Sequence, residues 1–330
     1  MKRLKPDRIA DLLERARQVR VLVVGDAMLD VYLRGAALRI SPEAPVPVVH
    51  VQEEWRAVGG AANVAANVVA LGAACDLIAC IGADRSGEEL RDELERAGIG
   101  AHGLVVMDRR RTTVKTRVLA RNQQVVRFDY EEEGDVDEVT ERRIIAAMAE
   151  CAEACDVIVL EDYDKGVLTP RVIAAAMELG RARDVPVVVD PKARHFFDYA
   201  GATVFKPNKV ELGAALRAPV NADDPEWMER TRRQLACANL LVTLGEDGMA
   251  LMTESGEYVR VPTVARSVYD VSGAGDTVIA VVGVALAAGA DPIEAAVLAN
   301  HAAGIEVGKA GVAPVSADEL MEGVLQHHGG

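Results

Sequence analysis

Residues 156–189 read DVIVLEDYDKGVLTPRVIAAAMELGRARDVPVVV, and their pattern indicates the fold class. Two expected strands, 156–160 and 185–189, are apolar after Asp156 and flank a helical pattern at 170–183. Strands buried on both faces have such runs, and neighbouring parallel strands need a crossover connection, usually a helix. The stretch therefore predicts a βαβ unit in a parallel sheet.

The same alternation continues along the chain. Further strands are expected at 21–24, 76–81, 103–107, 204–205 and 240–243, and further helices at 5–18, 60–71 and 86–97. We therefore expect an α/β fold with a doubly wound, mostly parallel sheet and helices on both of its faces.

Two segments break this rhythm. Three prolines at 42–47 exclude a helix from the first segment, about 31–55, and suit an edge strand. The second, about 112–130, alternates with period two, as a strand does. We expect both insertions to pair as a small β lid on a single domain that covers residues 1–330.

Composition narrows the class of protein. Half of the residues are hydrophobic, 4% are aromatic and the formal net charge is −14. Such a charge argues against nucleic acid or anionic membrane as a partner, and an anionic substrate would need a local basic pocket. The charged segment 1–18 does not resemble a signal peptide, and no membrane-length apolar run occurs, so we expect a cytoplasmic protein. The five cysteines are odd in number, lack C-x-x-C spacing and are predicted to be reduced.

The strongest local motif is Asp270-Val-Ser-Gly-Ala-Gly-Asp-Thr277, which an Ala/Val-rich run follows. Gly273, Ala274 and Gly275 are therefore expected at a helix N-terminus, where backbone N–H groups bind anions. Asp276 in the first turn can take a proton from a hydroxyl. A capped helix with an acidic first turn explains the local pattern equally well.

Two common phosphate-binding motifs do not fit this chain. Residues 304–310 are one residue short of a Walker A loop and lack its hydroxyl. Residues 273–278 have valine at the third position of a dinucleotide fingerprint.

Polar motifs also follow the other expected strands, at the edge where open α/β sheets bind ligands. They are Gly25-Asp26 with Asp30, Asp162 to Gly166, Asp190 to Lys192, and Asn208 with Glu211. The last two residues share one helical face and can hold Mg²⁺ through waters, with a capping box as the structural alternative. The triplet Arg109-Arg-Arg111 is expected to be solvated surface.

The chain resembles the ribokinase-like (PfkB) carbohydrate kinases over about residues 20–315. Gly59-Gly60 with Asn63, and Asp270 to Thr277, are similar to the two signatures of that family. Residues 25–30, 39–48 and 121–129 further resemble the D-glycero-β-D-manno-heptose 7-phosphate kinases. Because no H-x-G-H motif follows the kinase region, the chain resembles the monofunctional form, or the kinase domain of the bifunctional ADP-heptose synthesis protein.

This resemblance implies an activity. ATP would phosphorylate the anomeric C1 hydroxyl of the heptose 7-phosphate and give the 1,7-bisphosphate on the ADP-heptose route to lipopolysaccharide or S-layer glycans. It also implies Mg²⁺ as a cofactor and a homodimer formed through the lid strands. A kinase for another sugar or sugar phosphate, and a non-catalytic sugar- or nucleotide-binding regulator, are the alternatives.

The resemblance also implies residue roles. Asp276 would be the base, and Gly273, Ala274 and Gly275 the anion hole. The sugar hydroxyls would contact Asp26, Asp30, Gly59, Gly60 and Asn63. The substrate phosphate needs cations, and the candidates are Lys115 and Arg117 on one face of a lid strand, with Lys165 and Lys192.

The nucleotide would contact Asn208, Glu211, Thr243, Gly245, Gly248, Val271, Asn300, Ala303 and Gly304. Glu211 would also hold Mg²⁺ through water. Two residues depart from the family pattern: Lys206 stands where many relatives have Thr, and Glu161 where many have Ser.

Overall fold

The main body of the protein is a sheet flanked by helices, seen in a computed structural model that describes residues 4–121, 123–265, 269–309 and 311–328. Within these residues the sheet has nine strands, in the order β13-β12-β11-β10-β9-β8-β1-β4-β5. Strands β12 and β13 are antiparallel to their neighbours and the others run parallel. The strands are β1 (Arg20–Gly25), β4 (Ala74–Gly82), β5 (Leu104–Met107), β8 (Val157–Glu161), β9 (Val187–Asp190), β10 (Val204–Phe205), β11 (Asn239–Thr243), β12 (Met249–Met252) and β13 (Tyr258–Val261).

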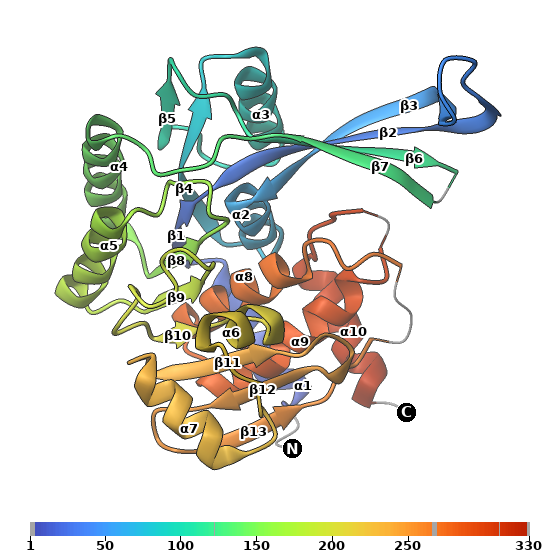
Figure 1. Ribbon diagram of the computed structural model, residues 1–330. Helices are drawn as coiled ribbons and strands as arrows, with labels where there is room; N and C mark the ends of the chain where they lie inside the picture. The colour runs from blue at the N-terminus through green and yellow to red at the C-terminus, as the bar shows by residue number, and fades with distance from the viewer. Residues whose placement is uncertain (1–3, 122, 266–268, 310, 329–330) are drawn as a thin grey trace.

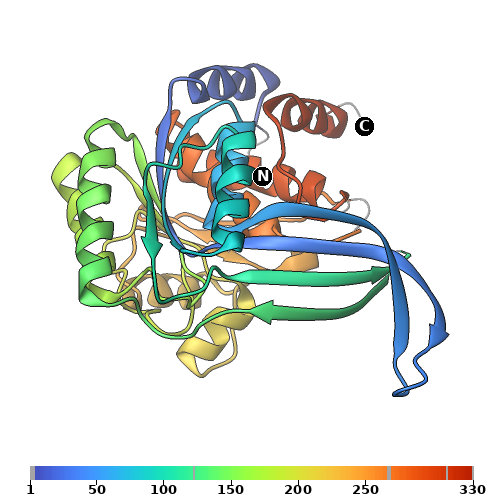
Figure 2. The same cartoon turned by 90° about the horizontal axis from the view of Figure 1, so that it is seen from above.

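Helices cover both faces of this sheet (Figures 1 and 2). Val21 and Val23 of β1 point into one hydrophobic core, and Leu22 and Val24 into the other. Both faces of the strand are therefore buried, which explains its unbroken apolar sequence. The first core lies under α1 (Pro6–Ala16), α2 (Ala61–Ala70), α3 (Arg85–Arg96), α8 (Ala274–Ala287), α9 (Pro292–Glu306) and α10 (Ala317–His328); the second lies under α4 (Glu138–Cys151), α5 (Pro170–Arg183), α6 (Lys209–Leu216) and α7 (Pro225–Gln234).

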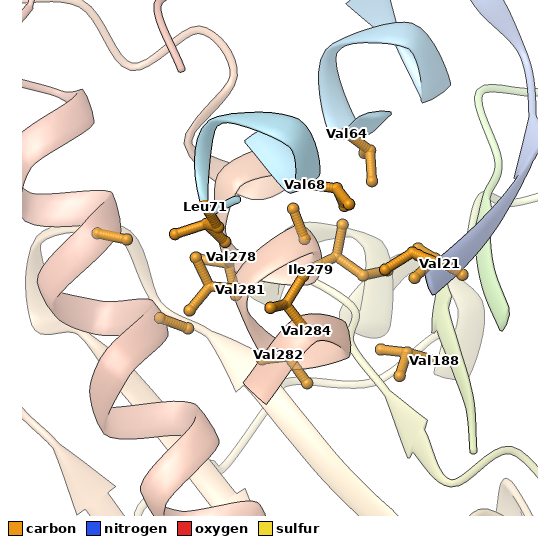
Figure 3. Close-up of a cluster of buried hydrophobic side chains, with 14 of the residues drawn as sticks. Val21, Val64, Val68, Leu71, Val188, Val278, Ile279, Val281, Val282 and Val284 are labelled. Carbon is orange, nitrogen blue, oxygen red and sulfur yellow. The ribbon is translucent and has the colours of Figure 1, made fainter. Parts of the chain in front are cut away.

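Helix α8 is apolar nearly all round, and every residue from 276 to 285 is buried. A helix of this kind must lie inside the protein. Figure 3 shows its valines meeting side chains of α2 as well as Val21 of β1 and Val188 of β9. The packing holds α8 on several sides, so the residues of its first turn occupy fixed positions.

The two expected insertions form a separate four-stranded sheet, in the order β3-β2-β6-β7. This lid projects from the body (Figures 1 and 2) and consists of β2 (Ala27–Ile40), β3 (Pro47–Gly60), β6 (Val114–Ala120) and β7 (Gln123–Tyr130). Its long strands begin and end nearer the body than the predicted 31–55, so they lead directly out of the motifs at Asp26 and Gly59–Gly60. The expected turn at 121–123 includes Asn122, which lies outside the described residues.

Doubly wound topology confirms the predicted fold class, and each predicted strand and helix is present with ends shifted by a few residues. All five cysteines are free thiols. Among the described residues, no helix has the length and hydropathy to cross a membrane.

The prediction for residues 109–111 was wrong at Arg110. Its guanidinium donates to the carbonyl oxygens of Glu132, Gly134 and Lys165 and ties three loops together. A run of three arginines gave no sign that the middle one turns inward.

Candidate active site

Asp276 lies at the start of α8, where the predicted catalytic base was expected. Its side chain is buried, and its Oδ2 accepts a hydrogen bond from Asn63 Nδ2 at 2.8 Å. Its Oδ1 accepts another from the Tyr163 hydroxyl, also at 2.8 Å. Burial raises the pKa of Asp276 to about 6, against the lowering effect of these two hydrogen bonds. The carboxylate is thus oriented, ionised at neutral pH and basic enough to accept a proton.

The turn before Asp276 is shaped to approach another group closely. Gly273 caps α8 with a φ of 91°, in the left-handed region that favours glycine. A Cβ atom on Gly275 would lie 3.7 Å from Lys206 Nζ and 3.8 Å from Asp190 Oδ2. The first N–H groups of a helix have no partner within the helix. A phosphoryl group at this turn would therefore meet backbone N–H groups with Lys206 beside them.

A row of charged side chains crosses the sheet beneath this turn. Glu161 ends β8 and pairs in register with Asp190, which ends β9, and Lys206 follows β10. Lys206 Nζ lies 2.7 Å from Asp190 Oδ2, and both side chains are buried. Burial disfavours the charge of Lys206, but the attraction of Asp190 and Glu161 outweighs it and raises the pKa.

Glu161 is the unusual member of the row. It has an exposed fraction of 0%, and neither carboxyl oxygen has a hydrogen-bond partner among the described residues. Burial and the negative charges of Asp190 and Asp276 raise its pKa well above the usual range. Burial and these neighbouring negative charges therefore disfavour the ionised form of Glu161.

A cleft of about 750 Å³ opens beside Asp276 and the turn at 273–275. Lys192 lines it, and so do all the residues predicted to contact the nucleotide. The latter are Asn208, Glu211, Thr243, Gly245, Gly248, Val271, Asn300, Ala303 and Gly304. Its size suits a ligand as large as a nucleotide. Gly304 packs closely against Val264, since a Cβ atom there would lie 2.8 Å from Val264 Cγ2.

The capping-box alternative for Asn208 and Glu211 is confirmed. Asn208 Oδ1 accepts from the Glu211 backbone N–H, and Glu211 Oε2 accepts from the Asn208 backbone N–H, both at 2.8 Å. Glu211 Oε1 meets the ammonium of Lys192, which lies 5.0 Å from the Tyr163 ring centroid. Lys192, predicted to bind the substrate phosphate, is thus placed in the cleft beside Glu211.

Asp26 has a structural task that the sequence did not reveal. Its carboxylate accepts hydrogen bonds from the backbone N–H groups of Tyr163, Lys165 and Val167, at 2.9, 2.9 and 3.0 Å. It therefore shapes the loop that carries Tyr163 to Asp276. The assignment of Asp26 to sugar hydroxyls stays a prediction.

The other predicted sugar contacts lie where the lid joins the body. Arg117 Nη1 lies 2.6 Å from Asp30 Oδ1, and both side chains are largely buried. A Cβ atom on Gly59 would lie 2.7 Å from Asp30 Oδ2, and one on Gly60 would meet the Asp26 carbonyl oxygen at 2.3 Å. Only glycine fits at either position while this arrangement is kept.

The predicted cations differ in how free they are. Lys165 pairs with Glu131 at 2.9 Å, and Arg117 pairs with Asp30. The structure shows no salt bridge to Lys115 in the described part of the chain; its ammonium lies 5.3 Å from the Tyr163 ring centroid. Lys115 is therefore the candidate most available to an incoming anion.

Tyr163, Asp190 and Glu306 belong to the site although no functional role was predicted for them. Tyr163 and Asp190 lie inside the polar motifs that follow the strands, and this position is the feature of the sequence that could have indicated them. Glu306 ends α9 as a buried acid whose two carboxyl oxygens have no partner among the described residues. Burial, with the charges of Asp270 and Asp276, raises its pKa to about 8. It lies behind the turn, since a Cβ atom on Gly273 would be 3.3 Å from its Oε1.

Known proteins share both the sequence and the fold of this chain. The family described as pfkB family carbohydrate kinase matches residues 18–319. "Bifunctional protein HldE" of Citrifermentans bemidjiense is 46% identical over 317 residues, which are 95% of this chain and 65% of that protein. The protein of the same name from Geotalea uraniireducens is 44% identical over 324 residues, covering 97% of this chain and 66% of the relative. The chain thus spans just under two thirds of these curated relatives.

Among solved structures, phosphofructokinase-2 from Escherichia coli in complex with potassium superposes with a TM-score of 0.77 at 18% identity, covering 93% of this chain and 99% of that chain. Arabidopsis thaliana ribokinase, complexed with ribose and ATP, gives a TM-score of 0.72 at 18% identity, with coverage of 93% and 98%. At these identities the likeness establishes the fold.

Proposed function

Because the chain belongs to the pfkB family of carbohydrate kinases, we propose that it transfers a phosphoryl group from ATP to D-glycero-β-D-manno-heptose 7-phosphate. The acceptor is the anomeric C1 hydroxyl and the product is the 1,7-bisphosphate on the ADP-heptose route. The observation that carries the proposal is the buried Asp276, oriented by Asn63 and Tyr163 at the mouth of a nucleotide-sized cleft. The sequence resemblance in 25–30, 39–48 and 121–129 supports the choice of sugar.

The geometry suits in-line phosphoryl transfer. Asp276 accepts the proton of the C1 hydroxyl while that oxygen forms a bond to the γ-phosphorus and the bond from this phosphorus to the ADP oxygen breaks. The N–H groups of the turn at 273–275 and the Lys206 ammonium face the charge on the transferred group. The lid excludes water, which would otherwise compete as acceptor.

The residues beside the cleft fit a divalent cation. Asp190 Oδ1 is buried without a partner among the described residues, and Glu211 lines the cleft. When bound, Mg²⁺ would neutralise part of the phosphate charge. Asp190 directly, and Glu211 through water, are the residues that would hold it.

The lid supports a proposed homodimer. Exposed apolar side chains gathered on one part of a protein often mark an interaction surface. The large apolar side chains exposed on the lid are Leu38, Ile40, Val46, Val51, Val125, Val126, Phe128 and Tyr130. Pairing of two lids would cover them. We also propose that residues 1–330 form one kinase domain, with these lid strands as insertions.

A coupled ADP-release assay across a panel of sugar phosphates tests the substrate, and NMR of the product locates the new phosphate. The expected result is turnover of the heptose 7-phosphate with phosphate added at C1, and none with ribose or fructose 6-phosphate. Turnover of another sugar alone would replace the substrate assignment. Binding of both ligands without ADP release would instead indicate a non-catalytic regulator.

A further inference from the structure

A second cluster of chemically active side chains lies away from Asp276, near the opposite ends of the strands. Asp76 is near the start of β4, His102 lies in the segment before β5, and Cys151 is the last residue of α4. His102 Nε2 is 3.3 Å from Asp76 Oδ1 and 3.5 Å from Cys151 Sγ. Within the residues that the structure describes, this is the one group of three whose ligand atoms all lie within 4.8 Å of one another.

From this geometry we propose that Asp76, His102 and Cys151 form a site for a divalent transition-metal ion of the zinc type. Zinc binds imidazole nitrogen and carboxylate oxygen at about 2.0–2.1 Å and thiolate sulfur at about 2.3 Å. In a tetrahedral shell these bond lengths separate nitrogen from oxygen by about 3.3 Å and nitrogen from sulfur by about 3.5 Å. The two distances in the protein match those edges.

Hydrogen bonding alone satisfies this cluster poorly. Asp76 and Cys151 both approach the same ring nitrogen, which can either donate to Asp76 or accept from the Cys151 thiol, but not both at once. A catalytic cysteine–histidine–aspartate arrangement is also excluded, since it needs the acid on the other ring nitrogen. A cation at the centre would instead meet an electron pair from each of the three atoms.

The surroundings support such a site. Arg20 Nη1 lies 3.2 Å from Asp76 Oδ2 and so directs the other oxygen, Oδ1, toward His102. The side chain of His102 is 62% exposed, which gives an ion a path from solvent. A bound ion would displace the thiol proton of Cys151. Mixed sulfur, nitrogen and oxygen ligands favour zinc-type ions over Mg²⁺ or Ca²⁺.

The ion would connect the end of α4 to the amino end of β4 and to the segment before β5. Because the predicted catalytic groups lie at the carboxyl ends of the strands, the metal would act on stability and leave turnover unchanged. The inference therefore does not depend on the proposed kinase activity.

The test uses the full chain, stripped of metal with EDTA and then titrated with Zn²⁺ or Co²⁺ in millimolar Mg²⁺. The expected result is one more tightly held zinc per chain in the wild type than in a His102→Gln/Cys151→Ser variant, measured by plasma mass spectrometry. Zinc should raise the melting temperature of the wild type alone. Cobalt should give a thiolate charge-transfer band that Cys151→Ser removes and Cys155→Ser keeps.

His195→Gln is the matched control, since His195 meets Asp198 through Nδ1 and Asp135 through Nε2, on opposite sides of the ring. It should keep the zinc and the cobalt band. Equal zinc uptake by the wild type and the double variant, or a cobalt spectrum without a sulfur band, would overturn the proposal. Melting curves of the metal-free proteins show whether each variant is folded.

Discussion

Replacing Tyr163 by phenylalanine tests how the protein sets the basicity of Asp276. The variant loses only the hydroxyl that donates to Asp276 Oδ1 at 2.8 Å. A hydrogen bond to a charged group contributes about 1.5–3 kcal/mol, and one pKa unit corresponds to about 1.4 kcal/mol. The loss should therefore raise the pKa of Asp276 by about one to two units from its value of about 6.

The consequence for catalysis has a definite sign. The base works only when ionised, so activity rises as pH passes upward through its pKa. At pH 7 the ionised fraction of Asp276 should fall from about 90% to about 10–50%. The Tyr163→Phe variant should thus lose about two- to tenfold of its kcat at pH 7 and regain most of it near pH 9.

The assay is ADP release against pH, with Tyr199→Phe as the matched control. Tyr199 donates a similar buried hydrogen bond, at 2.7 Å, to Asp162 and not to Asp276. Its removal should lower stability and leave the acidic limb of the profile in place. The reasoning would be refuted if Tyr163→Phe lowered the rate by the same factor at every pH. It would also be refuted if Tyr199→Phe shifted the acidic limb of the pH profile as much as Tyr163→Phe does.

Three further changes probe the site. Asp276→Asn should lower kcat by about 10²–10⁴-fold and leave the Kd for ATP nearly unchanged in calorimetry; near-normal turnover would remove Asp276 as the base. Arg117→Met should raise KM for the sugar phosphate, because Asp30 loses its partner, while Kd for ATP stays constant; a change in Kd for ATP alone would contradict this placement. Lys206→Thr should lower the free energy of unfolding by about 3–5 kcal/mol in urea titrations, and adding Glu161→Ser should recover part of that loss; strictly additive effects would count against a shared charge balance.

The central architecture was predictable because burial leaves a direct mark on sequence. A strand covered on both faces needs an apolar run, and residues 21–24, 157–160 and 187–189 of β1, β8 and β9 are such runs. The position of Asp276 at the start of a buried helix was also predictable from the glycines before a long apolar run, although the local pattern fitted a structural cap equally well. The predicted cleft residues came together because parallel strands end at one edge.

Contacts between distant segments were not predictable in the same way. Asp26 accepts three N–H groups from residues 163–167, and no spacing rule connects positions that far apart. Tyr163 lies in the polar motif Asp162 to Gly166, but its hydrogen bond to Asp276 depends on the loop conformation that Asp26 holds. The lid strands extend beyond their predicted ends at residues 27–30 and 58–60, which are all buried and so show no alternating pattern.

The row of Glu161, Asp190 and Lys206 shows how three ionisable side chains can be buried together. Two buried carboxylates and one lysine would leave a net negative charge in the core, which costs several kcal/mol. The raised pKa of Glu161 favours its protonated form, which reduces that excess beside the ion pair between Lys206 and Asp190. Lys206 is therefore held beside the turn at 273–275 by its ion pair with Asp190. Its ammonium is free to bind a phosphoryl group only when another cation binds to Asp190 in its place.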